Sequence, residues 1–174
     1  MSFALARALV AATFLALAPI AAGAGAGGAS TRAAAIVERI VDGDTLVVRG
    51  GARIRLVQID APEAGTECYS ASSTRELVRL APPGTRIALD ADRRLDRVDR
   101  YDRLLRYVFA AGKNVNVELV RRGAATPYFY GGDRGRYASA LLSATSAARS
   151  AGRGMWGACR VTWSAEDPVD TRPR

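Results

Sequence analysis

The sequence contains no histidine, and only two of its 174 residues are cysteine. Without imidazole, histidine cannot serve as a general base, as the partner of a nucleophile or as a metal ligand. The two cysteines lie far apart in the chain and do not form the closely spaced pair of a zinc site. Any general base must therefore be a carboxylate or a rarer group.

Acidic residues are also scarce relative to basic ones. The chain has 17 Asp and Glu against 25 Lys and Arg, nearly all of them Arg, for a formal net charge of +8. Such an excess attracts a polyanion such as nucleic acid, although solubility or an anionic membrane would explain it as well. The length suits one domain with a proper core and leaves no room for a second.

A long apolar run occurs only near the start, at residues 8–22. Arg7 precedes it, and small residues that follow include two Ala-Gly-Ala sequences at 22–24 and 24–26. This pattern predicts a signal peptide over residues 1–28, and hence a secreted or extracytoplasmic protein. A membrane anchor is the alternative, but the run is shorter than the roughly 20 residues of a spanning helix.

Residues 41–63 form the most informative stretch of the chain. Segments 46–48 and 54–59 are rich in β-branched and aliphatic residues. Gly50 and Gly51 between them supply the positive backbone angles of a tight two-residue turn. The stretch therefore predicts an antiparallel hairpin.

Charged side chains meet at the open end of this hairpin. If the two glycines form the turn, Asp44 faces Val57, close to where Asp60 follows the second strand. Strict alternation places Arg55 and Asp60 on opposite faces. The strand must therefore bulge or end before Asp60 if both side chains serve one site.

The acids of this stretch, Asp44, Asp60 and Glu63, suggest a metal site. Clustered carboxylates raise each other's pKa unless a cation lies between them. Oxygen ligands suit Ca²⁺ or Mg²⁺ rather than Zn²⁺. Taken alone, Asp42-Gly43-Asp44-Thr45 or Asp60-Ala61-Pro62-Glu63 is more simply a polar turn at the end of a strand. The two together, on either side of Arg55, favour the metal site.

Together with later motifs, the hairpin resembles the active-site hairpin of the thermonuclease family, the staphylococcal-nuclease-like domains. The matching motifs in chain order are Asp42-Gly43-Asp44-Thr45, Arg55, Asp60-Ala61-Pro62-Glu63, Asp99-Arg100-Tyr101-Asp102-Arg103, residues 115–123, Tyr128-Phe129-Tyr130 and Gly154-Met155-Trp156-Gly157. The resemblance covers residues 36–163. It implies an α+β fold, a five-stranded OB-fold β-barrel with about three packed helices, within a domain of residues 33–163.

The resemblance also implies roles for the charged residues. The ligands of a bound Ca²⁺ would be Asp44, Asp60 and the backbone carbonyl of Ala61. Glu63 would activate or orient the attacking water as general base. Arg55 and Arg103 would bind the phosphate and stabilise the transition state. Asp102 stands where the family usually has Gly, and an acid there would pair with Arg103 or repel substrate phosphate, lowering activity.

Four further side chains are candidate substrate contacts: Arg100, Tyr101, Tyr128 and Tyr130. Tyr128 and Tyr130 lie two apart in an extended segment after Pro127, so both rings project from one face. Stacking on bases is the functional interpretation. Packing at the rim of the core is the alternative.

The rest of the chain predicts ordinary elements. The expected strands are 33–41, 85–90 and 104–110, and the expected helices are 73–80, 115–122 and 137–151. Ser73 and Glu76 form a possible capping box for the first helix. In an exported protein, Cys68 and Cys159 are expected to form a disulfide that closes a loop of about ninety residues. Residues 164–174 carry acids and two prolines, and we expect them to be disordered.

These observations predict an exported Ca²⁺-dependent nuclease. The resemblance implies cleavage of DNA and RNA at the 5′-oxygen to leave 3′-phosphates, by a monomer without a stable protein partner. A catalytically inactive OB-fold module that binds nucleic acid is the alternative, and a cell-surface protein that binds other polyanions is a weaker one. The complete set of acids and arginines favours the enzyme, because a binding module needs no general base.

Overall fold

The computed structural model describes residues 32–174, so the predicted signal peptide over residues 1–28 lies outside the described residues. Five strands of the described part form a closed barrel: β1 (Ala33–Ile40), β2 (Thr45–Val48), β3 (Arg53–Leu56), β5 (Arg86–Asp90) and β6 (Leu104–Ala110). Antiparallel neighbours follow the order β3-β2-β1-β5-β6, and a parallel pairing of β3 with β6 closes the barrel. The predicted α+β fold with a five-stranded OB-type barrel is confirmed.

In the part of the chain that the structure describes, three helices of more than one turn pack against this barrel: α1 (Ser70–Leu80), α2 (Val115–Arg121) and α3 (Ala138–Ser150). Each helix contributes one fully buried leucine to the main core, Leu77, Leu119 and Leu141 respectively. These leucines meet Leu46 and Ile54 from the barrel interior. The alternation of the strands therefore supplies one wall of the core, and the apolar stripes of the helices supply the other.

The start of α1 differs from the prediction. The helix begins at Ser70, after Tyr69 in a left-handed conformation with φ of 72°, and no side chain caps it. Ser73 is fully buried, and its hydroxyl donates to the carbonyl of Ala124 at 2.6 Å. Glu76 accepts from Arg122 at 2.9 Å. The expected capping box is therefore wrong, because both side chains bind residues just beyond the end of α2 and not the start of α1.

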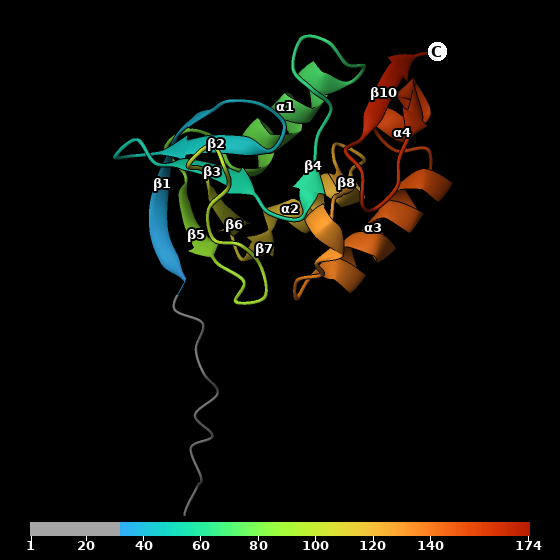
Figure 1. Ribbon diagram of the computed structural model, residues 1–174. Coiled ribbons are helices and arrows are strands. Elements are labelled where there is room, and N and C mark those ends of the chain that lie inside the picture. The colour runs from blue at the N-terminus through green and yellow to red at the C-terminus, as the bar shows by residue number, and fades with distance from the viewer. Residues whose placement is uncertain (1–31) are drawn as a thin grey trace, which may run out of the picture.

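Short elements connect the barrel to the helical side. These are β4 (Ile59–Asp60), which pairs with β8 (Thr126–Pro127), β7 (Lys113–Asn114), the 3-10 turn η1 (Tyr130–Gly132) and α4 (Met155–Ala158). In Figure 1 the barrel strands gather on one side of the molecule and α3, α4 and β10 on the other, with β4 and β8 between them. The β4–β8 pair thus lies where the hairpin meets the helices.

The end of the chain is ordered, contrary to prediction. β9 (Cys159–Thr162) and β10 (Asp170–Pro173) form an antiparallel pair, which Figure 1 shows in red beside α4. Val169 and Thr171 are buried at 4% and 2% exposure. The prediction of disorder for residues 164–174 is therefore wrong, because a few buried side chains and backbone pairing hold a segment whose composition is polar.

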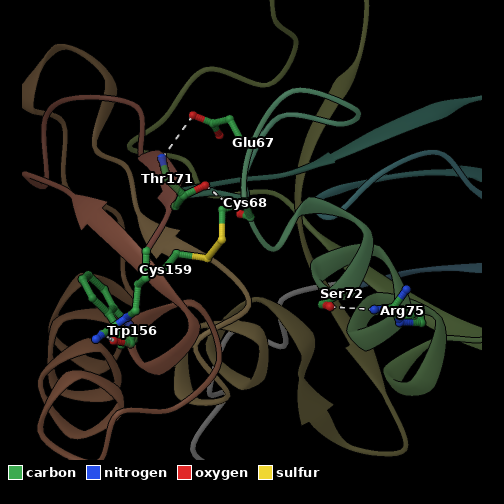
Figure 2. Close-up of a disulfide and its surroundings, with 8 residues drawn as sticks. Glu67, Cys68, Ser72, Arg75, Trp156, Cys159 and Thr171 are labelled. Atoms are coloured by element: carbon green, nitrogen blue, oxygen red, sulfur yellow. Dashed lines mark hydrogen bonds between the residues drawn. A yellow bond between two sulfur atoms is a disulfide. The ribbon is translucent and has the colours of Figure 1, made fainter.

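The predicted disulfide between Cys68 and Cys159 is present, with the two Cα atoms 6.1 Å apart. Figure 2 shows it joining the loop after β4 to the start of β9. It lies in a small apolar cluster that also contains Met155 and Val169. No helix within residues 32–174 combines the length and the apolar character needed to cross a membrane.

Candidate active site

The hairpin that carries the site has a longer turn than predicted. Thr45 pairs with Arg55, and the turn closes where the amide of Val48 donates to the carbonyl of Ala52. The connection therefore holds three residues instead of two. Asp44 faces Leu56, whose amide donates to the Asp44 carbonyl at 2.8 Å, so the predicted pairing with Val57 is wrong by one residue.

The required break in the second strand is present. β3 ends at Leu56, and Gln58 adopts a left-handed conformation with φ of 62° before β4 resumes at Ile59. This turn reverses the alternation, so Asp60 comes to the same side as Arg55. The expectation that the strand must bulge or end before Asp60 is confirmed.

Arg55 is the centre of the site. Its Nη2 lies 3.0 Å from Asp44 Oδ2 and 2.9 Å from Asp60 Oδ1, and its Nη1 donates to the carbonyls of Leu56 at 2.9 Å and Ile59 at 2.7 Å. The Arg55 side chain is only 12% exposed. One guanidinium thus holds two carboxylates together and uses both terminal nitrogens to do so.

The two carboxylates are short of positive charge. Burial raises the pKa of Asp44 to about 7, although Arg55 opposes this rise, and Asp42 and Asp60 add to it. Burial likewise raises the pKa of Asp60 against the effects of Arg55 and of the Val169 amide. A second cation at this point would stabilise the charged form of both acids.

Gly43 allows the two halves of the site to approach. A Cβ atom at Gly43 would lie 2.6 Å from the Cβ of Ala61 and 2.8 Å from the Cβ of Ser73, which is too close for any side chain. At this closeness the Ala61 amide donates to Asp44 Oδ2 at 3.0 Å. The small residues at positions 43 and 61 therefore bring the Asp44 and Asp60 segments into contact.

Arg103 joins the same site through Thr45. Its Nη1 lies 3.4 Å from Thr45 Oγ1, and that hydroxyl donates to Asp44 Oδ1 at 3.0 Å. Its Nε donates to Asp99 Oδ2 at 2.7 Å, while Asp99 Oδ1 accepts from the amides of Tyr101 and Arg103. Asp99 thus fixes both the loop and the guanidinium at its end.

Asp102 does not pair with Arg103, so one of the two predicted effects of this acid is wrong. Asp102 is exposed and adopts a left-handed conformation with φ of 59°. Glycine adopts that conformation without strain, which explains why the family usually has Gly there. Within residues 32–174, no hydrogen bond or ion pair joins the Asp102 side chain to Arg103, whose partner is Asp99.

Glu63 is exposed and separate from the Arg55 centre. Its charge contributes to the raised pKa of Asp60, so the two acids are near each other. No hydrogen bond to the Glu63 side chain occurs within residues 32–174, but its amide donates to Glu67 Oε2 at 2.7 Å. The Glu63 carboxylate is therefore open to solvent and to substrate.

The predicted substrate contacts form two aromatic groups. Tyr101 is 55% exposed; its hydroxyl accepts from Arg100 at 2.7 Å, and the Arg103 guanidinium lies 5.4 Å from its ring. Tyr128 and Tyr130 lie edge to face with ring centroids 6.2 Å apart, as expected for rings on one face. Burial raises the pKa of Tyr128, and the charge of Asp60 adds a smaller contribution to this rise.

Four residues of the site were not singled out from sequence: Thr45, Asp99, Glu67 and Val169. Thr45 and Asp99 belong to motifs of the resemblance, and their hydrogen-bonding side chains could have identified them. Glu67 and Val169 lie outside those motifs. Only the folded arrangement shows their contacts.

The end of this OB-type barrel holds two acids, Asp44 and Asp60, with two arginines, Arg55 and Arg103, a set that suits the hydrolysis of phosphodiester bonds. The family model for staphylococcal nuclease homologues matches residues 53–158, more than half of the chain. The chain therefore belongs to the family of staphylococcal nuclease homologues.

Individual relatives agree with this assignment. The chain is 37% identical over 124 residues to "Uncharacterized endonuclease" of Escherichia coli O157:H7, covering 69% of this chain and 74% of that protein. It is 31% identical over 137 residues to Endonuclease YhcR of Bacillus subtilis (strain 168), covering 70% of this chain but only 11% of that protein. It is 30% identical over 103 residues to Thermonuclease of Staphylococcus intermedius, covering 55% of this chain and 60% of that protein.

Proposed function

We propose that this chain is a metal-dependent nuclease that hydrolyses phosphodiester bonds of DNA and RNA at the 5′-oxygen and leaves 3′-phosphates. The observation that carries the proposal is the assembly around Arg55 of two acids, with a second arginine linked to Asp44 through Thr45. Family membership supports the reaction class. Opposite charges held together at the end of the hairpin suit a reaction that adds negative charge to a phosphoryl group.

The acids fit a hard divalent cation, for which we propose Ca²⁺. Asp44 and Asp60 offer oxygen atoms only, and both have a raised pKa despite their shared guanidinium. Within residues 32–174, no group of three or more Asp, Glu, Cys or His side chains is spaced to hold a metal ion. The Ala61 carbonyl and solvent would therefore complete the ligand set. When bound, such an ion stabilises negative charge on the phosphoryl oxygens.

Three side chains of the site have separate roles in the proposed reaction. Glu63, exposed and near Asp60, accepts a proton from the attacking water. Arg103 keeps its Nη2 for the phosphate, because its Nε is bound to Asp99 and its Nη1 faces Thr45. Arg55 uses both terminal nitrogens on protein oxygens, so it contacts phosphate only by exchanging one of these partners.

The surroundings of the site suit single-stranded nucleic acid. Tyr101 and Tyr130 are among the most exposed large apolar side chains of the described residues, at 55% and 73%. Bases of any sequence stack on such rings. The predicted leader and the disulfide support export, and we propose that the enzyme acts outside the cytoplasm as a monomer.

The decisive experiment is hydrolysis of single-stranded DNA and of RNA by the wild type in Ca²⁺ and in EGTA, beside Glu63→Gln. We expect Ca²⁺-dependent cleavage to 3′-phosphate products and a loss of at least 100-fold in kcat in the variant. Glu38→Gln, which changes an exposed acid of β1, is the matched control. DNA binding without cleavage by the wild type would instead establish the inactive binding module.

A further inference from the structure

The C-terminal segment, residues 159–174, contacts three parts of the proposed active site. The family match ends at residue 158, so this segment lies beyond it. We call it the C-terminal hairpin, after its strands β9 and β10. The Cys68–Cys159 disulfide and the burial of Val169 and Thr171 anchor it to the body of the protein.

The first contact orients Asp60. The amide of Val169 donates to Asp60 Oδ2 at 3.0 Å, while Asp60 Oδ1 faces Arg55 at 2.9 Å. Both oxygens of this carboxylate therefore have fixed partners on opposite sides. A carboxylate held in this way cannot rotate freely about its terminal bond.

The second contact runs through Glu67 to the segment of the proposed general base. Glu67 Oε2 accepts from the Glu63 amide at 2.7 Å, and Glu67 Oε1 accepts from the Thr171 amide at 3.3 Å. Figure 2 shows Glu67 and Thr171 joined by this second bond, next to the disulfide. One carboxylate thus connects the hairpin to the backbone of Glu63.

The third contact supports the tyrosine segment. The indole Nε1 of Trp163 donates to the carbonyl of Pro127 at 2.8 Å, and the Phe129 amide donates to the carbonyl of Ala165 at 2.6 Å. These two bonds flank Tyr128. The hairpin therefore reaches the segments of a proposed metal ligand, of the general base and of a substrate contact.

We propose that the C-terminal hairpin is a positioning element of the nuclease site: through Glu67, which binds the Thr171 amide, it positions the Glu63 segment, and its Val169 amide orients Asp60. The proposal rests on the proposed function for its catalytic meaning. Neither residue is assigned a contact with substrate. They act through the side chains that they hold, as outer partners of metal ligands and bases commonly do.

The first test compares Glu67→Ala and Glu67→Gln with Glu166→Gln, which removes an exposed acid from the C-terminal hairpin. We expect kcat on single-stranded DNA to fall about ten-fold in Glu67→Ala, with KM within two-fold of the wild type. Glu67→Gln keeps one acceptor oxygen and should recover part of this loss. Glu166→Gln should match the wild type.

Amide hydrogen exchange supplies a readout that does not depend on activity. The Glu63 amide should exchange about ten-fold faster in Glu67→Ala, while amides of the barrel strands keep their protection. A variant that only loses stability would instead show faster exchange throughout the fold, with kcat unchanged below its melting temperature. That result, or an unchanged Glu63 amide, would overturn the role of Glu67.

The second test compares Val169→Pro with Val169→Ala. Both replace the buried valine side chain, but only proline also removes the backbone N–H that donates to Asp60. We expect calorimetric titration with CaCl₂ to give a Kd about ten-fold weaker for Val169→Pro than for Val169→Ala. Equal affinities would refute the role of the Val169 amide, and if Val169→Pro fails to fold, the Glu67 variants decide the proposal.

The two hypotheses fail in different ways. A wild type that binds Ca²⁺ but hydrolyses neither DNA nor RNA would refute the proposed function. Exchange at Glu63 and the Ca²⁺ affinities would then still decide whether the hairpin positions the site. A cleaving wild type with unaffected Glu67→Ala and Val169→Pro variants would keep the function and overturn the positioning role.

Discussion

Substitutions of Asp99 should change the free energy of unfolding and kcat by different amounts, and so separate its contributions to stability and to catalysis. It accepts three hydrogen bonds: from the amides of Tyr101 at 2.9 Å and Arg103 at 3.0 Å, and from Arg103 Nε at 2.7 Å. The Asp99 side chain is 17% exposed, so solvent weakens each interaction. We assign about 1 kcal/mol to each amide bond and about 1 kcal/mol to the ion pair.

Two substitutions separate the contribution of the amide bonds from that of the ion pair. Asp99→Ala loses all three bonds and should lower the free energy of unfolding by about 3 kcal/mol. Asp99→Asn keeps an oxygen for the two amides and loses the ion pair, which should cost about 1 kcal/mol. Because both release the Arg103 guanidinium, both should lower kcat by a similar factor, about ten-fold.

Urea unfolding and steady-state hydrolysis of single-stranded DNA measure the two quantities. Asp96→Asn, an exposed acid of the same loop, is the matched control and should resemble the wild type. An Asp99→Asn protein with wild-type kcat would refute the claim that Asp99 positions Arg103. Equal destabilisation by Asn and Ala would show that the ion pair, and not the amide bonds, carries the stability.

The same residue predicts a pH dependence. Burial raises the pKa of Asp99, but hydrogen bonds from Arg103 and Tyr101 outweigh burial and lower the pKa below its ordinary 3.8. A lowered folded-state pKa adds stability above the unfolded-state pKa, and this contribution is lost as the pH falls through the folded-state value. The stability difference between wild type and Asp99→Asn should therefore shrink below about pH 4.

Other predictions concern the disulfide, Asp102 and Tyr130. The double variant Cys68→Ser/Cys159→Ser should lose about 4 kcal/mol in urea unfolding, because the bridge spans 91 residues; a loss below about 1 kcal/mol would contradict the chain-entropy argument. Asp102→Gly should gain about 0.5 kcal/mol by relieving the positive φ and leave kcat unchanged, with Asp102→Asn as control; a ten-fold rise in kcat in both variants would instead show that the Asp102 charge repels substrate phosphate. Tyr130→Ala should raise KM for single-stranded DNA about ten-fold without changing the melting temperature, whereas Val78→Ala, on α1, should change neither; an unchanged KM would exclude stacking on this exposed ring.

Local patterns predicted much of the fold. β5 and β6 end at the predicted residues, Asp90 and Ala110, and the break before Asp60 followed from the need to place it beside Arg55. The missing capping box has a tertiary cause. Ser73 makes its hydrogen bond to Ala124 across the helix packing and not at the helix end.

The error at the end of the chain shows what composition leaves out. Residues 164–174 are polar, and their order depends on distant partners: Thr171 binds Glu67 and Cys68, and Val169 binds Asp60, 109 residues earlier. A polar segment is expected to be disordered only if nothing else in the fold satisfies its backbone.

The disulfide, however, was predictable from sequence, and it already implied where the C-terminal hairpin begins. A bond between Cys68 and Cys159 places the start of the hairpin next to the loop that follows Glu63. Asp170 follows Cys159 by eleven positions, enough for the chain to turn and return as β10. A segment tethered beside an acidic site, with free backbone amides and few apolar groups, satisfies those amides best on the nearby carboxylates of Asp60 and Glu67. The ordering of this segment and the positioning of the site are therefore one and the same interaction.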